Sequence, residues 1–164
     1  MRLLKHIDDK PLPKDVKPQL KTAARAILFD ENGLIPVLFV TKFDYHKIPG
    51  GEVEQGESEK DGPLREIKEE TGCTAEITKG VGKISEYRSR WNLLQTSYCY
   101  TGKIILKGRQ ELTEKERSQG FKLVWLSPDD AIAQLKKDKP KNYEGKFIQE
   151  RDLRFLEEVF LMKR

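Results

Sequence analysis

The sequence has only two cysteines, Cys73 and Cys99, and it contains no CxxC pair or Cys/His cluster with the spacing of a zinc site. Neither a disulfide framework nor a structural zinc site can be built from it. Its apolar runs fall far short of the roughly 20 residues that cross a bilayer, and its first residues lack the apolar core of a secretion signal. We therefore expect a cytoplasmic protein with no membrane partner.

The composition suits one folded domain. The 164 residues are 37% hydrophobic and 35% charged, which is enough for a core with a polar surface but short for two domains. The formal net charge of +4 is small, yet residues 51–70 hold eight acidic and three basic residues and carry net −5, so the rest of the chain carries +9. An acidic segment in a basic surround is typical of a site in which cations bridge carboxylates and phosphate.

Local signals predict the order of the elements. Residues 1–21 contain three prolines and are predicted to form an arm or a short edge element, while residues 22–164 form the domain. Asn32-Gly33 predicts a hairpin between strands at 22–29 and 34–42. Other patterns predict strands at 74–89, 93–106 and 122–126, and helices from Ser58 or Asp61 to Thr71, from Ser127 and from about Phe147. This order predicts an α/β fold, with helices on the faces of a mixed β-sheet.

One segment carries the pattern of a chemical site. From Gly51, five residues lead to Glu57, and seven more lead to the run Arg65-Glu66-Ile67-Lys68-Glu69-Glu70-Thr71-Gly72. Glu66, Glu69 and Glu70 are three and four positions apart, so on a helix their carboxylates share one face. Three like charges there destabilise a helix unless a cation binds, and magnesium prefers oxygen ligands. A bare Glu-x-x-Glu-Glu run is usually a solvated helix face, so it is the complete spacing that favours a metal site.

This spacing resembles the box that defines the Nudix hydrolases, or MutT-like proteins: Gly-x5-Glu-x7-Arg-Glu-U-x-Glu-Glu-x-Gly-U, where U is a bulky aliphatic residue. Every fixed position from Gly51 to Gly72 is present. Cys73 replaces the last aliphatic residue, and Gly62-Pro63 stands where other members often have helix formers. The resemblance implies the α/β/α sandwich of the family from about Thr22 to the C-terminus.

The resemblance also implies roles for the residues of the box. Glu66, Glu69 and Glu70 would be catalytic and would bind Mg²⁺ or Mn²⁺, with the carbonyl of Gly51 as a further ligand. A metal-activated water would attack phosphorus in line with the leaving phosphate, and one of the glutamates, preferably Glu66, would take its proton. Arg65 and Glu57 would form an ion pair that holds the loop against the helix and aims the ligands.

Residues outside the box are further candidates. Some members recruit a glutamate from a distant loop as base or ligand; Glu111, Glu114 and Glu116 lie where such a residue could fall, although a charged connector is more often solvated. Arg25 and Lys47 lie on segments that lead toward the box, so they are candidates for substrate contacts, the alternative being surface cations. Aromatic residues on strands could stack on a base but usually belong to the core; they are Tyr87, Trp91, Tyr98, Tyr100 and Trp125.

The implied activity is hydrolysis of a nucleoside diphosphate linked to another moiety. No proline occurs between Leu64 and Ser127, which argues against the ADP-ribose type of Nudix enzyme, and the downstream motif of the NADH type is absent. Nucleoside triphosphates are favoured by size and simplicity; dinucleoside polyphosphates and capped or triphosphorylated RNA ends stay open. The alternative is a Nudix-fold module that senses a nucleotide or RNA without cleaving it. Specific DNA binding is not expected.

Overall fold

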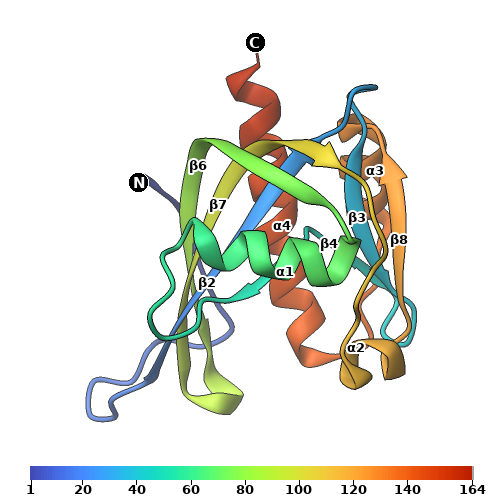
Figure 1. Cartoon of the computed structure of the whole chain (residues 1–164). Coiled ribbons are helices and arrows are strands. Elements are labelled where there is room, and N and C mark those ends of the chain that lie inside the picture. Colours follow the sequence, from blue (N-terminus) through green and yellow to red (C-terminus); the bar gives the residue numbers. More distant parts are fainter. Residues whose placement is uncertain (164) are drawn as a thin grey trace.

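A computed structural model describes residues 1–163. Its elements form two β-sheets with helices packed against them (Figure 1). In chain order they are β1 (Leu3–Asp8), β2 (Gln19–Phe29), β3 (Ile35–Val40), β4 (Tyr45–Lys47), β5 (Gly50–Glu52), α1 (Asp61–Thr71), β6 (Thr74–Arg88), the 3₁₀ turn η1 (Ser89–Trp91), β7 (Leu93–Leu106), α2 (Glu114–Ser118), β8 (Phe121–Leu126), α3 (Pro128–Lys137) and α4 (Tyr143–Met162).

The larger sheet has the strand order β1-β6-β7-β2-β5. β1 runs parallel to β6 and β2 runs parallel to β7, whereas β6 with β7 and β2 with β5 are antiparallel pairs. The sheet is therefore mixed, as the sequence predicts. The predicted long strands at 74–89 and 93–106 are confirmed as β6 and β7, which η1 joins at one end.

The smaller sheet, with the order β4-β3-β8, corrects one prediction. The strands predicted at 22–29 and 34–42 do not pair as a hairpin, because β2 lies between β7 and β5 while β3 lies between β4 and β8. The turn between them does form, with Gly33 at φ +76° and the amide of Asp30 bonded to the carbonyl of Leu34. Residues 23–28 of β2 and nearly all of β3 are buried, so each strand lies inside its own sheet and takes partners from distant segments.

Helices cover both faces of the larger sheet, with α1 in front and α4 behind it in Figure 1. Alternating residues of β2 show the two layers. Ala24 and Leu28 belong to the same cluster as Ile67 of α1, whereas Ile27 belongs to the cluster of Phe155 of α4. The predicted α/β architecture is thus confirmed. Successive side chains of β2 point alternately toward the α1 layer and the α4 layer.

Of the two starts predicted for the first helix, the structure has the one at Asp61; another helix start differs from the prediction, and one helix is new. α1 begins at Asp61, which puts Pro63 in the first turn, where a missing N–H breaks no helical bond. α4 begins at Tyr143 rather than near Phe147, because the side chain of Asn142 caps it by accepting the N–H of Gly145. α2 lies within the segment predicted as a charged connector. The helix predicted from Ser127 is confirmed as α3, with the Ser127 hydroxyl accepting the amide of Asp130.

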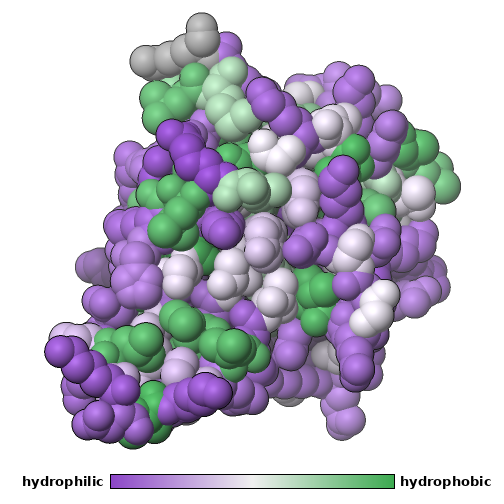
Figure 2. All heavy atoms as spheres, turned by 90° about the vertical axis from the view of Figure 1, so that its left-hand side faces the viewer, coloured by the Kyte–Doolittle hydropathy of each residue, from purple (hydrophilic) through white to green (hydrophobic). Residues whose placement is uncertain are grey.

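Within residues 1–21, β1 pairs with β6 at the end of the larger sheet, and β2 begins at Gln19. The face on the left-hand side of Figure 1 shows separate apolar patches divided by polar side chains (Figure 2). Among residues 1–163, no helix has both the length and the apolar composition of a membrane span.

Candidate metal and phosphate site

α1 places the acidic residues of the box against the loop that contains Gly50 and Gly51. Ile67 is buried on the sheet side of the helix, and Gly72 ends the helix in the left-handed conformation at φ +75°. A Cβ atom at position 51 would lie 2.7 Å from Cδ of Glu66. A side chain at position 51 would therefore push the Glu66 carboxylate away from the backbone.

Glu70 is the buried carboxylate of the site. Its Oε1 accepts a hydrogen bond from Nζ of Lys47 at 2.9 Å, and its Oε2 accepts the backbone N–H of Gly50 at 3.0 Å. Burial raises the pKa of Glu70 to about 7, although Lys47 and the Gly50 amide act in the opposite direction. A cation bound to the ionised Glu70 carboxylate would therefore stabilise it.

Three carboxylates from two helices meet at this point. Glu66 and Glu70 of α1 and Glu116 of α2 each offer an oxygen, and these oxygens all lie within 4.8 Å of one another. Burial also raises the pKa of Glu66, against the attraction of Arg65 and Lys47. Such a group of oxygen donors suits a divalent cation. Glu116 keeps its place because it forms a capping box with Thr113 at the start of α2.

The other predicted acidic candidates lie outside this group. Glu69 is on α1 with 35% of its side chain exposed, and its nearest ion-pair partner is Arg65, at 3.6 Å. Glu111 and Glu114 are exposed. Of the three glutamates proposed after β7, the structure brings only Glu116 to Glu66 and Glu70.

Arg65 connects Glu57, which lies outside the carboxylate group, to Glu66, which belongs to it. Its Nε and Nη2 donate to the two oxygens of Glu57 at 3.1 and 3.2 Å, and its Nη1 donates to Oε1 of Glu66 at 3.0 Å. It also bonds to the carbonyl of Glu52. The guanidinium therefore holds the Glu57 loop, β5 and one oxygen of Glu66 in a fixed relation.

The segment that leads to α2 is attached to the end of α1. Nε2 of Gln110 donates to the carbonyl of Glu70 at 2.7 Å, and the amide of Glu111 donates to the carbonyl of Glu69 at 2.7 Å. These bonds satisfy carbonyls that the helix end leaves open. They also tie the chain that carries Glu116 to the helix that carries Glu66.

A pocket of about 360 Å³ lies beside the carboxylates and contains both predicted substrate contacts, Arg25 and Lys47. Arg25 is buried, and no ion pair or side-chain hydrogen bond of Arg25 occurs within residues 1–163. Burial lowers the pKa of this guanidinium, and Arg151 acts in the same direction. A buried unpaired cation is costly, so an anion in the pocket would stabilise it.

Two more buried arginines line the pocket, and neither is among the predicted site residues. Arg88 donates to Glu86 at 2.6 Å, and Arg151 of α4 donates to Asp152 at 2.7 Å. Asp152 in turn accepts the amide of Ile48, just before the glycine corner. The two-residue spacing of Glu86 and Arg88 on a predicted strand is the signal that could have placed them on one face.

Comparisons with known proteins match the domain and the fold of this chain. A sequence model of the NUDIX domain matches residues 19–148. No curated protein matches the sequence significantly. The fold is similar to that of a NUDIX hydrolase from Nitrosomonas europaea (TM-score 0.65, 15% identity, 89% of this chain and 92% of that chain). It is also similar to a MutT protein from Methanosarcina mazei Go1 (0.63, 16%, 92% and 100%) and to an ADP-ribose pyrophosphatase from Streptococcus suis 89-1591 (0.55, 23%, 85% and 91%).

Proposed function

Because this chain belongs to the Nudix family of hydrolases, enzymes that act on phosphoric anhydride bonds, we propose that it cleaves the diphosphate linkage of a nucleotide, with a nucleoside triphosphate as the favoured substrate. The observation that carries this proposal is the meeting of Glu66, Glu70 and Glu116 within 4.8 Å beside a pocket that holds the unpaired Arg25. Carboxylates for a divalent cation and a fixed cation for phosphate are the two components that the reaction requires.

The donor set suits Mg²⁺ or Mn²⁺, which prefer carboxylate, carbonyl and water oxygens. Glu66 and Glu70 hold the cation in this proposal, with Glu69 and the carbonyl of Gly51 as the further ligands from the box and Glu116 as the ligand from α2. The bound cation would draw charge from the phosphate oxygens and make the attacking water more acidic. Arg65 and Glu57 keep the ligands aimed, as their shared hydrogen bonds suggest.

Glu66 is the preferred general base. Both oxygens of Glu70 accept hydrogen bonds, whereas Glu66 accepts one from Arg65 on Oε1 and has none on Oε2 within residues 1–163. Burial raises the pKa of Glu66, and a carboxylate with a raised pKa takes a proton from water more readily. Its free oxygen is therefore the one we assign to the proton.

The substrate preference rests on charge. Within residues 1–163 no carboxylate forms an ion pair with Arg25, so Arg25 can bind a phosphate group. Lys47 can do so once Glu70 binds the metal ion. Although the fold is similar to an ADP-ribose pyrophosphatase, the chain lacks a proline between Leu64 and Ser127. We therefore favour a substrate with several phosphates over a sugar-linked diphosphate.

A phosphate-release assay tests this proposal. The panel contains ATP, GTP, a dinucleoside tetraphosphate, a 5′-triphosphorylated RNA and ADP-ribose, each with Mg²⁺, Mn²⁺ or EDTA. We expect turnover of the polyphosphates only with a divalent cation. Glu69→Gln should lower turnover by at least about tenfold with the fold retained in circular dichroism, and Glu111→Gln is the matched control because Glu111 contributes only its backbone amide to α1.

Two results would overturn the proposal. Turnover that persists in EDTA would exclude the carboxylate group as the reaction centre, and full turnover in Glu69→Gln would remove Glu69 from the metal ligands. Nucleotide binding without turnover, and without any effect of the cation, would instead identify the chain as a Nudix-fold sensor.

A further inference from the structure

Trp91 is half exposed, unlike the buried tyrosines of the two strands that it connects. Its exposed fraction is 49%, although the sequence favours a core role for strand aromatics, whereas Tyr87 and Tyr100 are buried. Trp91 stands in η1, at the tip of the β6–β7 pair, and it lines the same pocket as Arg25. A single exposed apolar side chain needs no explanation, so the argument depends on where Trp91 lies and on how it is held.

Trp91 lines the end of the pocket that is remote from the carboxylates. In the larger sheet, Arg25 of β2 is level with Gly50, whereas Gln19 of β2 is level with Leu93, which follows the Trp91 turn. Six residues of a strand span about 20 Å. The pocket therefore extends along the sheet from the glycine corner toward Trp91, and its volume of about 360 Å³ lies in the range of small-molecule sites.

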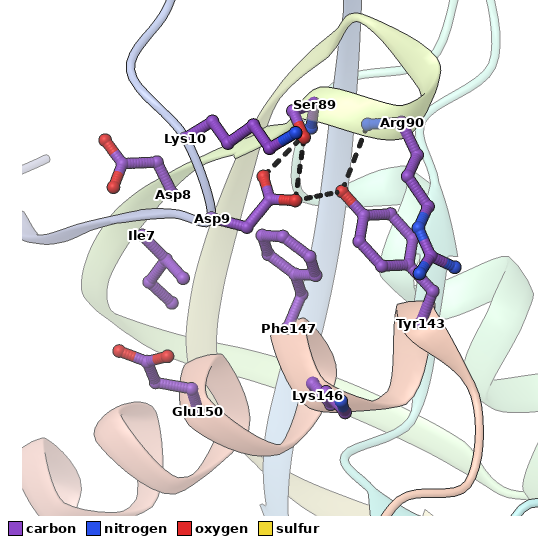
Figure 3. Close-up of a pocket in the computed structure, with 10 residues that line it drawn as sticks. All are labelled: Ile7, Asp8, Asp9, Lys10, Ser89, Arg90, Tyr143, Lys146, Phe147 and Glu150. Atoms are coloured by element: carbon purple, nitrogen blue, oxygen red, sulfur yellow. Dashed lines mark hydrogen bonds between the residues drawn. The ribbon is translucent and has the colours of Figure 1, made fainter.

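The turn that carries Trp91 is held in place by the N-terminal segment. Figure 3 shows Asp9 directed toward this turn: its carboxylate accepts hydrogen bonds from the amide and hydroxyl of Ser89 at 3.0 and 2.7 Å, and from the hydroxyl of Tyr143 at 2.8 Å. The Tyr143 hydroxyl in turn accepts the amide of Arg90 at 3.2 Å. The ring of Tyr143 meets the ring of Trp91 edge-on, with centroids 5.2 Å apart.

The neighbour of Trp91 inside the pocket has an unused donor. The guanidinium carbon of Arg88 lies 5.8 Å from the centroid of the Trp91 ring, and its buried Nε has no acceptor within residues 1–163. A nucleobase offers both things that this end of the pocket lacks: a flat ring to stack on an exposed indole, and ring or keto acceptors for an arginine donor. A phosphate group suits it less, because Arg88 is already paired with Glu86 and Glu144.

We propose that Trp91 is the stacking platform for the nucleobase of the substrate, with Arg88 donating to an acceptor on the base and Asp9 as a positioning residue that fixes the Trp91 turn. The assignment rests on the proposed function and adds the orientation of the substrate, with the phosphates at Arg25 and the carboxylates and the base at the opposite end. It also gives the N-terminal segment a task in substrate recognition.

Substitution of Trp91 tests the platform. Stacking predicts that Trp91→Ala raises the KM for ATP or GTP by roughly 5- to 100-fold, and that Trp91→Phe restores most of the loss. Tripolyphosphate has the phosphates without a base, so its inhibition constant should be unchanged in both variants. A similar weakening of tripolyphosphate, or an unchanged KM for the nucleotide, would overturn the assignment.

Asp9→Asn should act in the same direction as Trp91→Ala, with a higher KM for the nucleotide and an unchanged inhibition constant for tripolyphosphate. Asp8→Asn is the matched control, because Asp8 points away from Ser89 and Tyr143 (Figure 3). Equal effects of the two asparagine variants would exclude Asp9 as a positioning residue.

Fluorescence separates this inference from the proposed function. The chain has two tryptophans, so Trp125→Phe leaves Trp91 as the only reporter. The α,β-methylene analogue of ADP, which has no phosphoric anhydride bond, should quench Trp91 without any turnover, whereas tripolyphosphate should not. Quenching by the analogue would support the platform even if no nucleotide is hydrolysed, and its absence would refute the platform even in an active enzyme.

Discussion

The ammonium group of Lys47 lies 2.9 Å from Oε1 of Glu70, and it also donates to the carbonyl of Gly50 at 3.3 Å. Both side chains are largely shielded from water, with 12% of the lysine and 2% of the glutamate exposed. The lysine lowers the pKa of Glu70, but burial has the larger effect and leaves that pKa at about 7. The charge state of this pair therefore changes close to neutral pH.

The stability of the metal-free protein should fall as the pH rises through this range. Glu70 has a folded pKa of about 7, above its ordinary value of 4.5, so the folded state binds the proton more tightly. The resulting stabilisation is fully present below pH 4.5 and is lost as the pH rises to about 7, by up to roughly 3 kcal/mol. Urea unfolding in EDTA at pH 5 and pH 8 measures it. Glu70→Gln, which cannot titrate, should lack this component, and an identical pH dependence in both proteins would contradict it.

Removal of Lys47 should have a pH-dependent effect. In Lys47→Met the pKa of Glu70 rises further, because the attraction of the ammonium group is lost. We expect the metal-free variant to lose about 1–3 kcal/mol of unfolding free energy at pH 8, where Glu70 must either carry an unpaired buried charge or take up a proton, and much less at pH 5. Lys60→Met is the control, since Lys60 is exposed. Equal losses at both pH values would show that packing, not charge, is responsible.

Glu116 should contribute to cation binding, whereas Glu114 should not. Glu116→Gln removes one carboxylate from the group but keeps a side chain that completes the capping box, so α2 should persist. We expect Mn²⁺ affinity, measured by isothermal titration calorimetry, to fall about 10- to 100-fold. Glu114→Gln lies on the same short helix and should bind Mn²⁺ like the parent protein. Equal affinities in the two variants would remove Glu116 from the site.

Arg25 should lower the unfolding free energy of the ligand-free protein while increasing its affinity for the substrate. Arg25→Met replaces a buried unpaired cation with an apolar side chain of similar length, so the ligand-free variant should gain about 1 kcal/mol or more of unfolding free energy. The same change should raise the KM for a nucleoside triphosphate by at least about tenfold. Arg109→Met, at an exposed position, should change neither quantity. A destabilised Arg25→Met variant would show that the pocket already balances this charge.

The helical periodicity of the glutamates on α1 could be recognised in the sequence. The three- and four-residue spacing of Glu66, Glu69 and Glu70 and the glycine that ends α1 are local signals, and strong propensities support them. The side of β2 on which the Arg25 side chain lies is not determined by a local signal. β2 is buried on both sides, so its apolar pattern does not tell which layer a given side chain meets.

Glu116 shows a different limit. Thr113-x-x-Glu116 is a capping-box signature and can be read from the chain, yet the helix that it starts has only five residues. So short a helix depends on its tertiary surroundings rather than on its own propensity. Sequence spacing therefore could not choose among Glu111, Glu114 and Glu116; the contact between the end of α1 and residues 110–111 makes that choice.

The same contact has a consequence for how the chain tolerates changes in length. Gln110 and Glu111 are anchored to the carbonyls of Glu70 and Glu69, so the number of residues between Glu111 and Glu116 sets the reach of the Glu116 carboxylate. An insertion before residue 110 would enlarge a loop and leave that reach intact. An insertion after residue 111 would move one of the three carboxylates away from the other two.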